Sequence, residues 1–543
     1  MQNRPSSAYF ASRSEVIGIN GMVASSHSLA SAAGIEILKK GGSAVDAAIA
    51  ANAVLAVVEP TGCGIGGDLF AICWIEGDKK LYGLNGSGRS SLLSDINQIK
   101  ERGYSTIPKL GPLSITVPGC VDAWFELHNK FCNLEMEEIL KPAIYLAENG
   151  FPLTEVITFY WNRNMAAFKE FPSAYALFGS EKRVKGERIK NESLAKTLSV
   201  IAKSGKDVFY QGDIARKISD FIVQSGGNFC EEDLNRHSSI WVDPLSINYR
   251  GYDIWELPPN GQGIAVLQML NMLEEYNLAD IKWNSAEYIH LLVEAKKLVY
   301  EDRAKYYSDP DFSDFDYNRL LTKSYAKERS QFIDLSVASK TVSAGSVSEG
   351  DTVYLSTADQ WGNMVSFIQS NYMGMGSGIA PPGLGFMLQN RGCSFSLDKN
   401  HANCLESGKR PFHTIIPAFV SKEDKPMISF GLMGGDMQPQ GHVQIISNIF
   451  DHGMNLQEAG DAPRVRHEGS SDPNGNLAVE LGGTLFLEHG FSDDTIADLG
   501  RRGHNVKVQK GGYGGYQAIM KNQKQNVYYG ASEYRKDGCA LAY

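Results

Sequence analysis

Thr352 stands between a stretch rich in serine and glycine and an alternating run at residues 353–358. If the peptide bond between Asp351 and Thr352 were cut, Thr352 would carry both a hydroxyl and a free α-amine. An α-amine titrates near pH ~8, so it can serve as the general base for the hydroxyl of the same residue. These residue types predict a threonine nucleophile that is created by cleavage of the chain. Taken alone, the Asp351-Thr352 pair also fits an ordinary cap at the start of a strand.

The elements around Thr352 are predicted to hold it on a rigid hairpin. Residues 353–358 alternate with the period of two that is typical of a half-buried strand. Residues 359–363 favour a turn and residues 364–368 a second strand, so the two strands are expected to pair with Thr352 at the open end. Residues 336–349 lack periodicity and indicate an exposed loop. In such a loop the Thr352 hydroxyl can attack the Asp351 carbonyl, giving an ester that water opens.

Patterns elsewhere predict a mixture of helices and strands. Helices are expected at residues 29–38, 44–58, 136–148, 192–203, 214–224, 263–275 and 286–302, and strands at residues 69–75 and 80–84. The chain has 543 residues, of which 43% are hydrophobic, so it can bury a large core. These numbers allow either several domains or one large domain.

A series of motifs runs along nearly the whole chain. In order they are residues 41–48 (GGSAVDAA), 58–67 (VEPTGCGIGG), 117–119 (VPG), 142–143 (PA), 150–152 (GFP), 302–303 (DR), 309–312 (DPDF), 434–435 (GG), 461–464 (DAPR) and 515–519 (GYQAI). In this order, and flanking a threonine at the expected place, they resemble the γ-glutamyltransferase (glutathione hydrolase) family. The resemblance implies an α+β fold, a four-layer αββα sandwich of the N-terminal-nucleophile hydrolase type. It also implies a large fragment, residues 1–351, and a small fragment, residues 352–543, intertwined in one domain.

The resemblance also implies roles for residues around the nucleophile. Gly434 and Gly435 match the glycine pair whose backbone N–H groups bind the oxyanion formed when the threonine attacks an amide. A tight turn between a strand and a helix is the other interpretation of this pair. Ser370 matches the position of a hydroxyl near the nucleophile. Asn371 lies one position from the family's substrate-binding asparagine.

The match departs from the family pattern where the glutamyl head group binds. Arg391 replaces a glutamine and Ser394 replaces an aspartate, and this aspartate would bind the ammonium of a γ-glutamyl group. An arginine at this place favours a carboxylate and repels an amine. His413 and Thr414 stand where the family has two serines that hold the α-carboxylate.

Two further charged residues are candidates for head-group binding. Arg89 is displaced by about two residues from the family's carboxylate-binding arginine, and it could still reach the same carboxylate. Asp436 directly follows the glycine pair and could supply the missing anion for an ammonium group. A surface turn residue is the other interpretation of Asp436.

The sequence therefore predicts an autoprocessed γ-glutamyl amidohydrolase or transferase, similar to glutathione hydrolases, that forms an acyl-enzyme on Thr352. The departures keep a second enzymatic reading open, an acylase for another small dicarboxylic acid amide of glutaryl or oxamate type. A non-enzymatic alternative is an unprocessed homologue that acts as a ligand-binding or scaffold protein.

Charge and composition limit the partners. The net charge is −10 and no lysine or arginine stripe occurs, which argues against nucleic acid. Residues 1–7 lack the apolar core of a signal peptide and the apolar block at 44–58 is too short to span a bilayer, so a cytoplasmic protein without a membrane partner is expected. The eight cysteines show no CxxC pattern and are expected to be free thiols.

No cofactor or metal is implied. The expected partners are a small-molecule substrate and the two fragments of the same chain, and an oligomer is possible.

Overall fold

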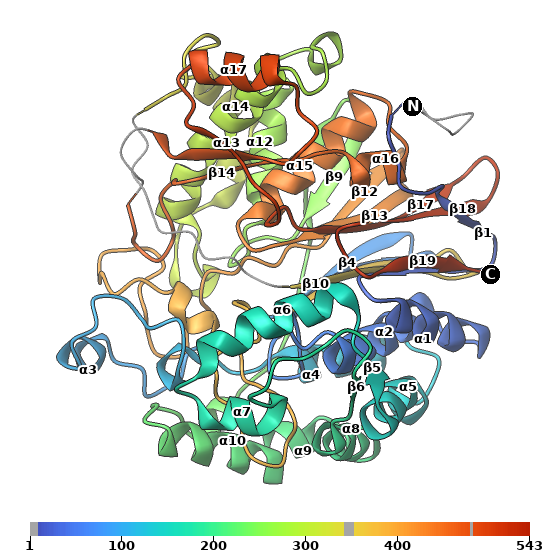
Figure 1. Ribbon diagram of the computed structural model, residues 1–543, viewed down its shortest axis with the longest axis vertical. Coiled ribbons are helices and arrows are strands. Elements are labelled where there is room, and N and C mark those ends of the chain that lie inside the picture. The colour runs from blue at the N-terminus through green and yellow to red at the C-terminus, as the bar shows by residue number, and fades with distance from the viewer. Residues whose placement is uncertain (1–8, 341–351, 478–481) are drawn as a thin grey trace.

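The computed structural model describes residues 9–340, 352–477 and 482–543, and places two seven-stranded sheets face to face (Figure 1). The first sheet has the order β1 (Val16–Gly18), β18 (Val527–Ser532), β17 (Gly515–Asn522), β13 (Lys425–Met433), β12 (Ala418–Lys422), β9 (Tyr252–Glu256) and β8 (Leu245–Tyr249). The second has the order β19 (Cys539–Ala542), β2 (Met22–Ser25), β10 (Val353–Ala358), β11 (Met364–Ser370), β3 (Asp68–Ile75), β4 (Lys80–Gly86) and β7 (Ile240–Val242). Neighbouring strands in both sheets are antiparallel.

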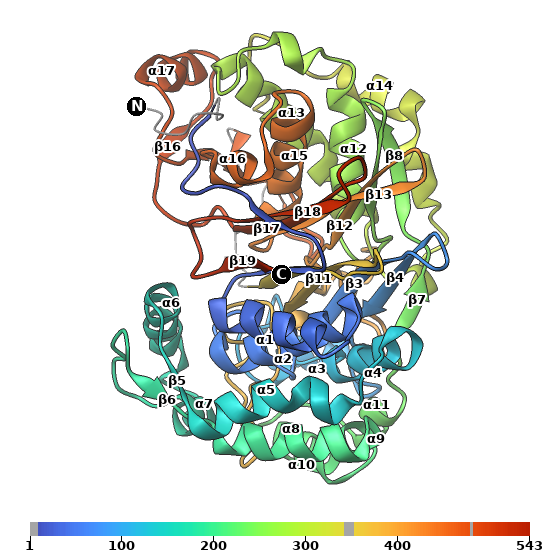
Figure 2. The ribbon, with the colours of Figure 1, turned by 90° about the vertical axis from the view of Figure 1, so that its right-hand side faces the viewer.

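Helices cover the outer face of each sheet (Figures 1 and 2). On the side of the second sheet lie α1 (Ser28–Lys39), α2 (Ala44–Val58), α4 (Cys120–Phe131), α5 (Met136–Asn149), α6 (Glu155–Met165), α7 (Pro172–Phe178), α8 (Glu192–Ser204), α9 (Asp207–Tyr210) and α10 (Asp213–Gln224). On the side of the first sheet lie α12 (Gly263–Leu273), α13 (Ala286–Tyr306), α14 (Lys323–Ser330), α15 (Met437–Phe450), α16 (Leu456–Asp461) and α17 (Asp493–Arg501). The four-layer αββα arrangement predicted from the resemblance is therefore confirmed.

Shorter elements complete the described chain. They are the helices α3 (Ile96–Glu101) and α11 (Glu231–Asn235), the strand pair β5 (Phe151–Pro152) and β6 (Arg188–Ile189), and the three-stranded sheet of β14 (Val465–Glu468), β15 (Thr484–Leu487) and β16 (Val506–Val508). Single 3₁₀ turns lie at Pro112–Ser114, Ala166–Phe168, Leu278–Asp280, Pro310–Phe312, Tyr317–Leu321 and Arg391–Ser394.

Three apolar clusters hold the layers together. One lies between the two sheets and includes Phe70, Tyr354 and Phe419. A second joins α1, α2, α5 and α8 to the outer face of the β2–β10–β11–β3 region, and a third joins α12, α13 and α15 to the first sheet. Because burial of apolar area is the main favourable term in folding, each cluster fixes one interface between layers.

The buried helix α2 begins where the sequence predicts it. The Ser43 hydroxyl accepts the N–H of Asp46, and the Asp46 carboxylate accepts the N–H of Ser43, which forms a capping box. Every residue of α2 is buried, because β10 and β11 lie on one side of it and α1 and α5 on others. None of the helices in the described ranges combines the length and the apolar character needed to cross a bilayer.

The hairpin predicted after Thr352 is confirmed and lies in the middle of the second sheet. β10 pairs with β11 from Val353 opposite Gln369 to Ala358 opposite Met364. β2 flanks β10 and β3 flanks β11. The strand is not half-buried as the alternation predicted, because all six residues of β10 are buried. One face of β10 packs toward α2 and the other toward the first sheet, so neither face meets solvent.

Candidate active site

Thr352 directly precedes β10, beside the last residue of β11. Its Oγ1 donates a hydrogen bond to Ser370 Oγ over 3.2 Å, and the residue is buried at the wall of a cavity. We call this the nucleophile cavity, and its wall includes Thr352, Gly434, Asp436, Lys296, Arg303 and Asp472. The structure thus brings Ser370 and Gly434 to the predicted nucleophile. Asp351 lies outside the described residues.

Gly434 and Gly435 form the turn between β13 and α15. This position agrees with both interpretations of the pair, as a binding site for an oxyanion and as a tight turn between a strand and a helix. Gly434 has φ +122° and Gly435 has φ +56°, values that favour glycine. Within the described chain, neither backbone N–H donates to a protein acceptor. Free N–H groups at the start of a helix favour negative charge. Gly434 also lines the nucleophile cavity, so the turn can bind an oxyanion that forms near Thr352.

The glycine-rich residues 62–67 form a close-fitting wall behind the nucleophile. A Cβ added to Gly62 would lie 3.2 Å from the Thr352 carbonyl oxygen. A Cβ added to Gly67 would lie 2.3 Å from the Ser370 carbonyl oxygen, which is backbone and has little room to move. This motif therefore sets how closely the loop approaches the open end of the hairpin.

The fit at Gly67 gives a testable prediction. We expect Gly67→Ala to lower the free energy of unfolding by about 1–3 kcal/mol or more, because overpacking forces backbone shifts. Urea denaturation of the purified variant measures this effect. Gly77→Ala is the control, because a Cβ there meets nothing within 4 Å, and it should change stability by less than about 0.5 kcal/mol. Equal stabilities for the two variants would contradict the role of Gly67.

Arg303 organises the charges of the nucleophile cavity, although the sequence indicated it only as part of a motif. Its Nη1 donates to Asp436 Oδ1 over 2.6 Å and its Nη2 to Asp472 Oδ1 over 3.0 Å. The guanidinium also lies over the Tyr300 ring at 3.9 Å. Burial, together with the charge of Asp436, raises the pKa of Asp472 to about 7. Asp436 therefore lies in the turn before α15, partly exposed, and is already paired with Arg303.

A second cavity adjoins the first. We call it the Tyr372 cavity; its wall includes Tyr372, Cys393, Ser394 and Phe412, and it shares Asp436 and Asp472 with the nucleophile cavity. Its lining includes Ser394, one of the predicted head-group residues. Two cavities that meet at one carboxylate pair can hold the two parts of a single substrate.

Arg391 lies beneath Tyr372 and has no exposed surface. Its guanidinium stacks on the Tyr372 ring at 3.8 Å, and its Nη1 donates to Thr414 Oγ1 over 2.8 Å. Among the described residues, its Nε and Nη2 atoms have no hydrogen-bond partner. Burial lowers the pKa of Arg391 to about 10, so it keeps its charge at neutral pH. A buried cation with unused donors is suited to receive an anion.

His413 lies in the same buried layer and is bonded to Asp68. Its Nε2 lies 2.9 Å from Asp68 Oδ2, and its Nδ1 accepts the N–H of Ile415 over 3.4 Å. Burial raises the pKa of Asp68 to about 7 against the lowering effect of Arg391, and burial holds the pKa of His413 well below its usual range. The predicted residues Arg391, His413 and Thr414 are thus brought together, and Asp68 is a partner that the sequence interpretation missed.

Ser394 and Asp436 are the predicted binding residues that line a cavity, whereas Asn371 and Arg89 bond to other parts of the chain. Asn371 Nδ2 donates to the carbonyls of Cys63 and Met375, and the next residue, Tyr372, lines the second cavity instead. The expectation that Asn371 faces the substrate site is therefore not met by the structure.

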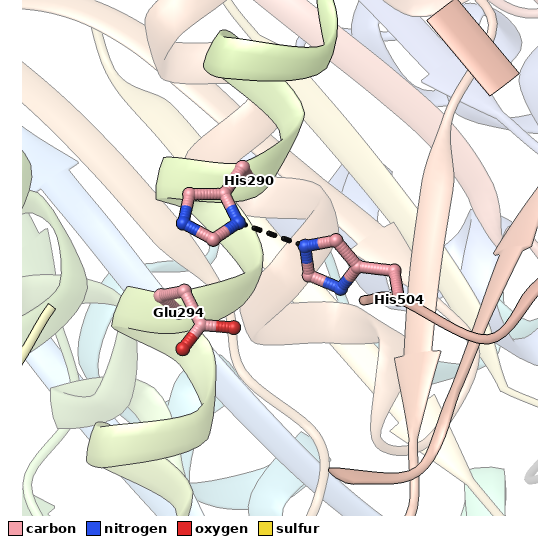
Figure 3. Close-up of side chains that lie close together, drawn as sticks. All are labelled: His290, Glu294 and His504. Atoms are coloured by element: carbon pink, nitrogen blue, oxygen red, sulfur yellow. Dashed lines mark hydrogen bonds between the residues drawn. The ribbon is translucent and has the colours of Figure 1, made fainter. Parts of the chain in front are cut away.

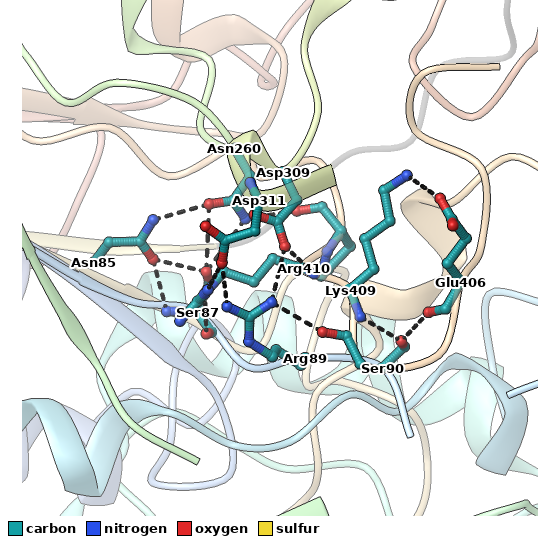
Figure 4. Close-up of polar contacts among 12 residues, drawn as sticks. Asn85, Ser87, Arg89, Ser90, Asn260, Asp309, Asp311, Glu406, Lys409 and Arg410 are labelled. Carbon is teal, nitrogen blue, oxygen red and sulfur yellow. Dashed lines mark hydrogen bonds and ion pairs between the residues drawn. The ribbon is translucent and has the colours of Figure 1, made fainter. Parts of the chain in front are cut away.

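Arg89 lies in a separate network of ion pairs (Figure 4). Its Nη1 donates to Asp309 over 3.1 Å and to the Gly408 carbonyl over 2.9 Å, and its Nη2 donates to Asp311 over 2.6 Å. Asp309 is buried and also accepts the N–H of Arg410. These contacts hold Arg89 away from the lining of both cavities, so the structure does not bring it to the predicted carboxylate site.

One group within the described ranges has the side chains and spacing of a metal site. The potential ligand atoms of His290, Glu294 and His504 lie within 4.8 Å of one another (Figure 3). However, His290 Nδ1 is 2.9 Å from His504 Nε2, and His290 Nε2 is 2.7 Å from the Asp334 carbonyl. Glu294 accepts a hydrogen bond from Lys297 over 2.7 Å. Hydrogen bonds within the protein account for this cluster, and we assign no metal to it.

Comparison with known proteins agrees with the geometry. The family model described as Gamma-glutamyltranspeptidase matches residues 30–543. The chain belongs to this family. It is 39% identical over 533 residues to the glutathione hydrolase-like YwrD proenzyme of Bacillus subtilis, covering 97% of this chain and 99% of the relative. It is 32% identical over 544 residues to the oxamate amidohydrolase proenzyme of Klebsiella pneumoniae, covering 97% and 99%.

A solved structure extends the comparison to three dimensions. The crystal structure of cephalosporin acylase from Bacillus halodurans superposes with a TM-score of 0.91 at 40% identity, covering 100% of this chain and 99% of that one. The predicted family, α+β fold and enzyme class are confirmed for this member of the gamma-glutamyltranspeptidase family.

Proposed function

We propose that this protein is a threonine amidohydrolase that cuts its own chain between Asp351 and Thr352 and then cleaves amides of small dicarboxylic acids. The observation that carries the proposal is the position of Thr352, hydrogen-bonded to Ser370 in a cavity that Gly434 also lines. The relatives named above are called proenzymes, which supports processing into fragments 1–351 and 352–543.

The chemistry uses groups of the chain itself. After processing, the α-amine of Thr352 takes the hydroxyl proton while Oγ1 adds to the substrate carbonyl carbon. The N–H groups of Gly434 and Gly435 bind the resulting oxyanion. When the intermediate collapses, the carbon–nitrogen bond breaks, the amine leaves with the proton, and an ester remains on Thr352. Water adds to the ester in the same way, releasing the acid and restoring the hydroxyl, and an amine in place of water gives transfer.

The main candidate substrate is a γ-glutamyl compound such as glutathione. The name of the YwrD relative supports it, and Arg391 supplies a buried cation for the carboxylate of the acyl group. The acyl head group is expected in the Tyr372 cavity, since Ser394 and Tyr372 line it.

A second candidate is an amide of a dicarboxylic acid without the glutamyl amine. The observation in its favour concerns the carboxylates among the described residues that line the two cavities, each of which is already in an ion pair. Asp436 and Asp472 pair with Arg303, and Glu468 pairs with Arg466. An ammonium group therefore finds no unpaired anion on those walls. The oxamate amidohydrolase and cephalosporin acylase relatives agree with this alternative.

Hydrolysis of two matched substrates tests the proposal and separates the candidates. γ-Glutamyl nitroanilide and glutaryl nitroanilide differ only in the amine of the acyl group and release the same chromophore. A higher kcat/KM for the first supports the glutathione-like activity, and a higher value for the second supports the acylase. If neither is cleaved and the purified chain stays in one piece, the scaffold alternative is favoured.

Arg391 gives a prediction within this proposal. We expect Arg391→Gln to lower kcat/KM for the better of the two nitroanilides by about 10- to 100-fold, because a charge-assisted contact to the acyl carboxylate is lost. Arg89→Gln is the matched control, since the Arg89 guanidinium is already bonded to Asp309 and Asp311, and it should stay within about threefold of the wild type. Circular dichroism checks that both variants fold. Equal losses in the two variants would argue against carboxylate binding by Arg391.

All eight cysteines are free in the structure. This is compatible with a reducing compartment and supports our proposal that the protein works in the cytoplasm.

A further inference from the structure

Lys296 is a buried lysine in the wall of the nucleophile cavity. It lies on α13 and is only 2% exposed. Its Nζ donates to Ser470 Oγ over 2.8 Å and lies 3.2 Å from His467 Nδ1. The ammonium also lies over the Tyr300 ring at 4.0 Å.

Lys296 forms no ion pair with a carboxylate in the part of the chain that the structure describes. No carboxylate among the described residues lies within 4.0 Å of its Nζ, whereas Asp436 and Asp472 are both held by Arg303. Burial holds the pKa of His467 well below its usual range, and His467 Nε2 faces the Gly482 carbonyl, so this ring is neutral and its Nδ1 accepts from Lys296. An ammonium has three donors, and two are used here. Burial, together with the charge of Arg303, lowers the pKa of Lys296 to about 7, and a bound anion would hold the amine in its charged form. One donor of that ammonium remains for such a ligand.

The position of Lys296 indicates which part of the substrate it meets. The predicted head-group residue Ser394 lines the Tyr372 cavity, and Arg391 lies beneath Tyr372, so the acyl group is placed on that side. Thr352 and Lys296 line the other cavity. Attack on an amide carbon leaves the acyl part and the amine part on opposite sides of the breaking bond, so the amine part extends into the nucleophile cavity.

We propose that Lys296 binds a carboxylate on the amine part of the substrate and thereby selects leaving groups and acceptors that carry an anion. Amino acids and short peptides have this chemistry, whereas simple alkylamines and anilines lack it. The inference rests on the proposed amidohydrolase function and names the class of amine that the same site prefers. Lys296 acts here as a residue that determines specificity, since its hydrogen bonds in the described chain go to Ser470 and His467 and not to Thr352.

Paired leaving groups test the inference. The two substrates share the acyl group that the wild type prefers, and their leaving amines are nitroaniline and its ring-carboxylated form. We expect the wild type to favour the carboxylated amide and Lys296→Met to lower the ratio of the two kcat/KM values by about tenfold, because a charge-assisted contact is lost. Lys296→Arg keeps the cation and should hold the ratio within about threefold of the wild type.

The adjacent lysine provides the matched control. Lys297 is on the same helix and is equally buried, but it pairs with Glu294 and the Ser339 carbonyl and does not line the cavity. Lys297→Met should therefore leave the ratio unchanged. An unchanged ratio in Lys296→Met, or an equal shift in Lys297→Met, overturns the inference while the amidohydrolase function stands. A wild type that cleaves neither amide overturns both.

A measurement on the wild type removes any dependence on the folding of the variants. The two free amines released by these substrates are compared as inhibitors. The carboxylated amine should inhibit about tenfold more strongly than nitroaniline. Equal inhibition by the two amines overturns the inference.

Discussion

Thr352→Ala is expected to yield a single uncut chain of 543 residues whose turnover of the preferred nitroanilide is lower by about 10⁴-fold or more. The substitution removes the Oγ1 that bonds Ser370 and faces the nucleophile cavity, and the same oxygen is needed for both self-cleavage and acyl transfer. Intact-mass measurement shows whether fragments 1–351 and 352–543 form, and a chromogenic assay gives the rate.

A control on the same strand separates loss of the nucleophile from loss of the strand. The Thr357 hydroxyl donates to the Ala44 carbonyl, away from the cavity, and Thr357→Ser retains this hydroxyl. We expect this variant to be cut and active. Cleavage and normal turnover in Thr352→Ala would show that another residue is the nucleophile.

Gly434→Ala is the second substitution for which we expect a large effect, a fall in kcat of about 10²- to 10³-fold. The φ of +122° at Gly434 is a conformation that L residues rarely adopt, and an added Cβ would lie 3.2 Å from Gly514 Cα. The turn must therefore shift, and the N–H groups that we propose bind the oxyanion move with it. Because these contacts strengthen in the transition state, kcat should fall more than KM rises.

The control is another glycine with a positive φ that has no place in the site. Gly453 has φ +69°, and an added Cβ there meets nothing within 4 Å. Gly453→Ala should cost stability through backbone strain alone and leave kcat within about threefold. A comparable fall in kcat for the two variants would attribute the effect at Gly434 to general destabilisation.

The parts of the site that depend on local chain geometry could be predicted from the sequence. Alternation and turn residues placed the hairpin after Thr352, and the predicted helix 44–58 agrees with α2 at both ends. Gly434 and Gly435 were indicated by the family resemblance, and their backbone conformation, which few residues other than glycine accept, explains why glycine stands there. The layer order likewise came from the family resemblance, because periodicity does not say which faces pack together.

The residues that were missed or misplaced depend on contacts between distant parts of the chain. The sequence suggested that Arg89 could bind the carboxylate of the substrate. In the structure its guanidinium is bonded instead to Asp309 and Asp311, which lie more than two hundred positions later in the chain. Lys296 and Lys297 look equivalent in the sequence, yet helical rotation directs only Lys296 to the cavity. The depth of burial that leaves two nitrogen atoms of Arg391 without a hydrogen-bond partner among the described residues also has no local pattern.

The central position of the β10–β11 hairpin in its sheet has a consequence for how the enzyme must be made. A large fragment synthesised alone would lack both strands, so β2 and β3 would each present an unpaired edge. Such edges recruit strands from other molecules and lead to aggregation. Synthesis as one chain, followed by a cut beside strands that are already paired on both sides, avoids this stage. After the cut proposed above, we expect the two pieces to stay together on dilution and not to exchange between molecules unless the sheet itself unfolds.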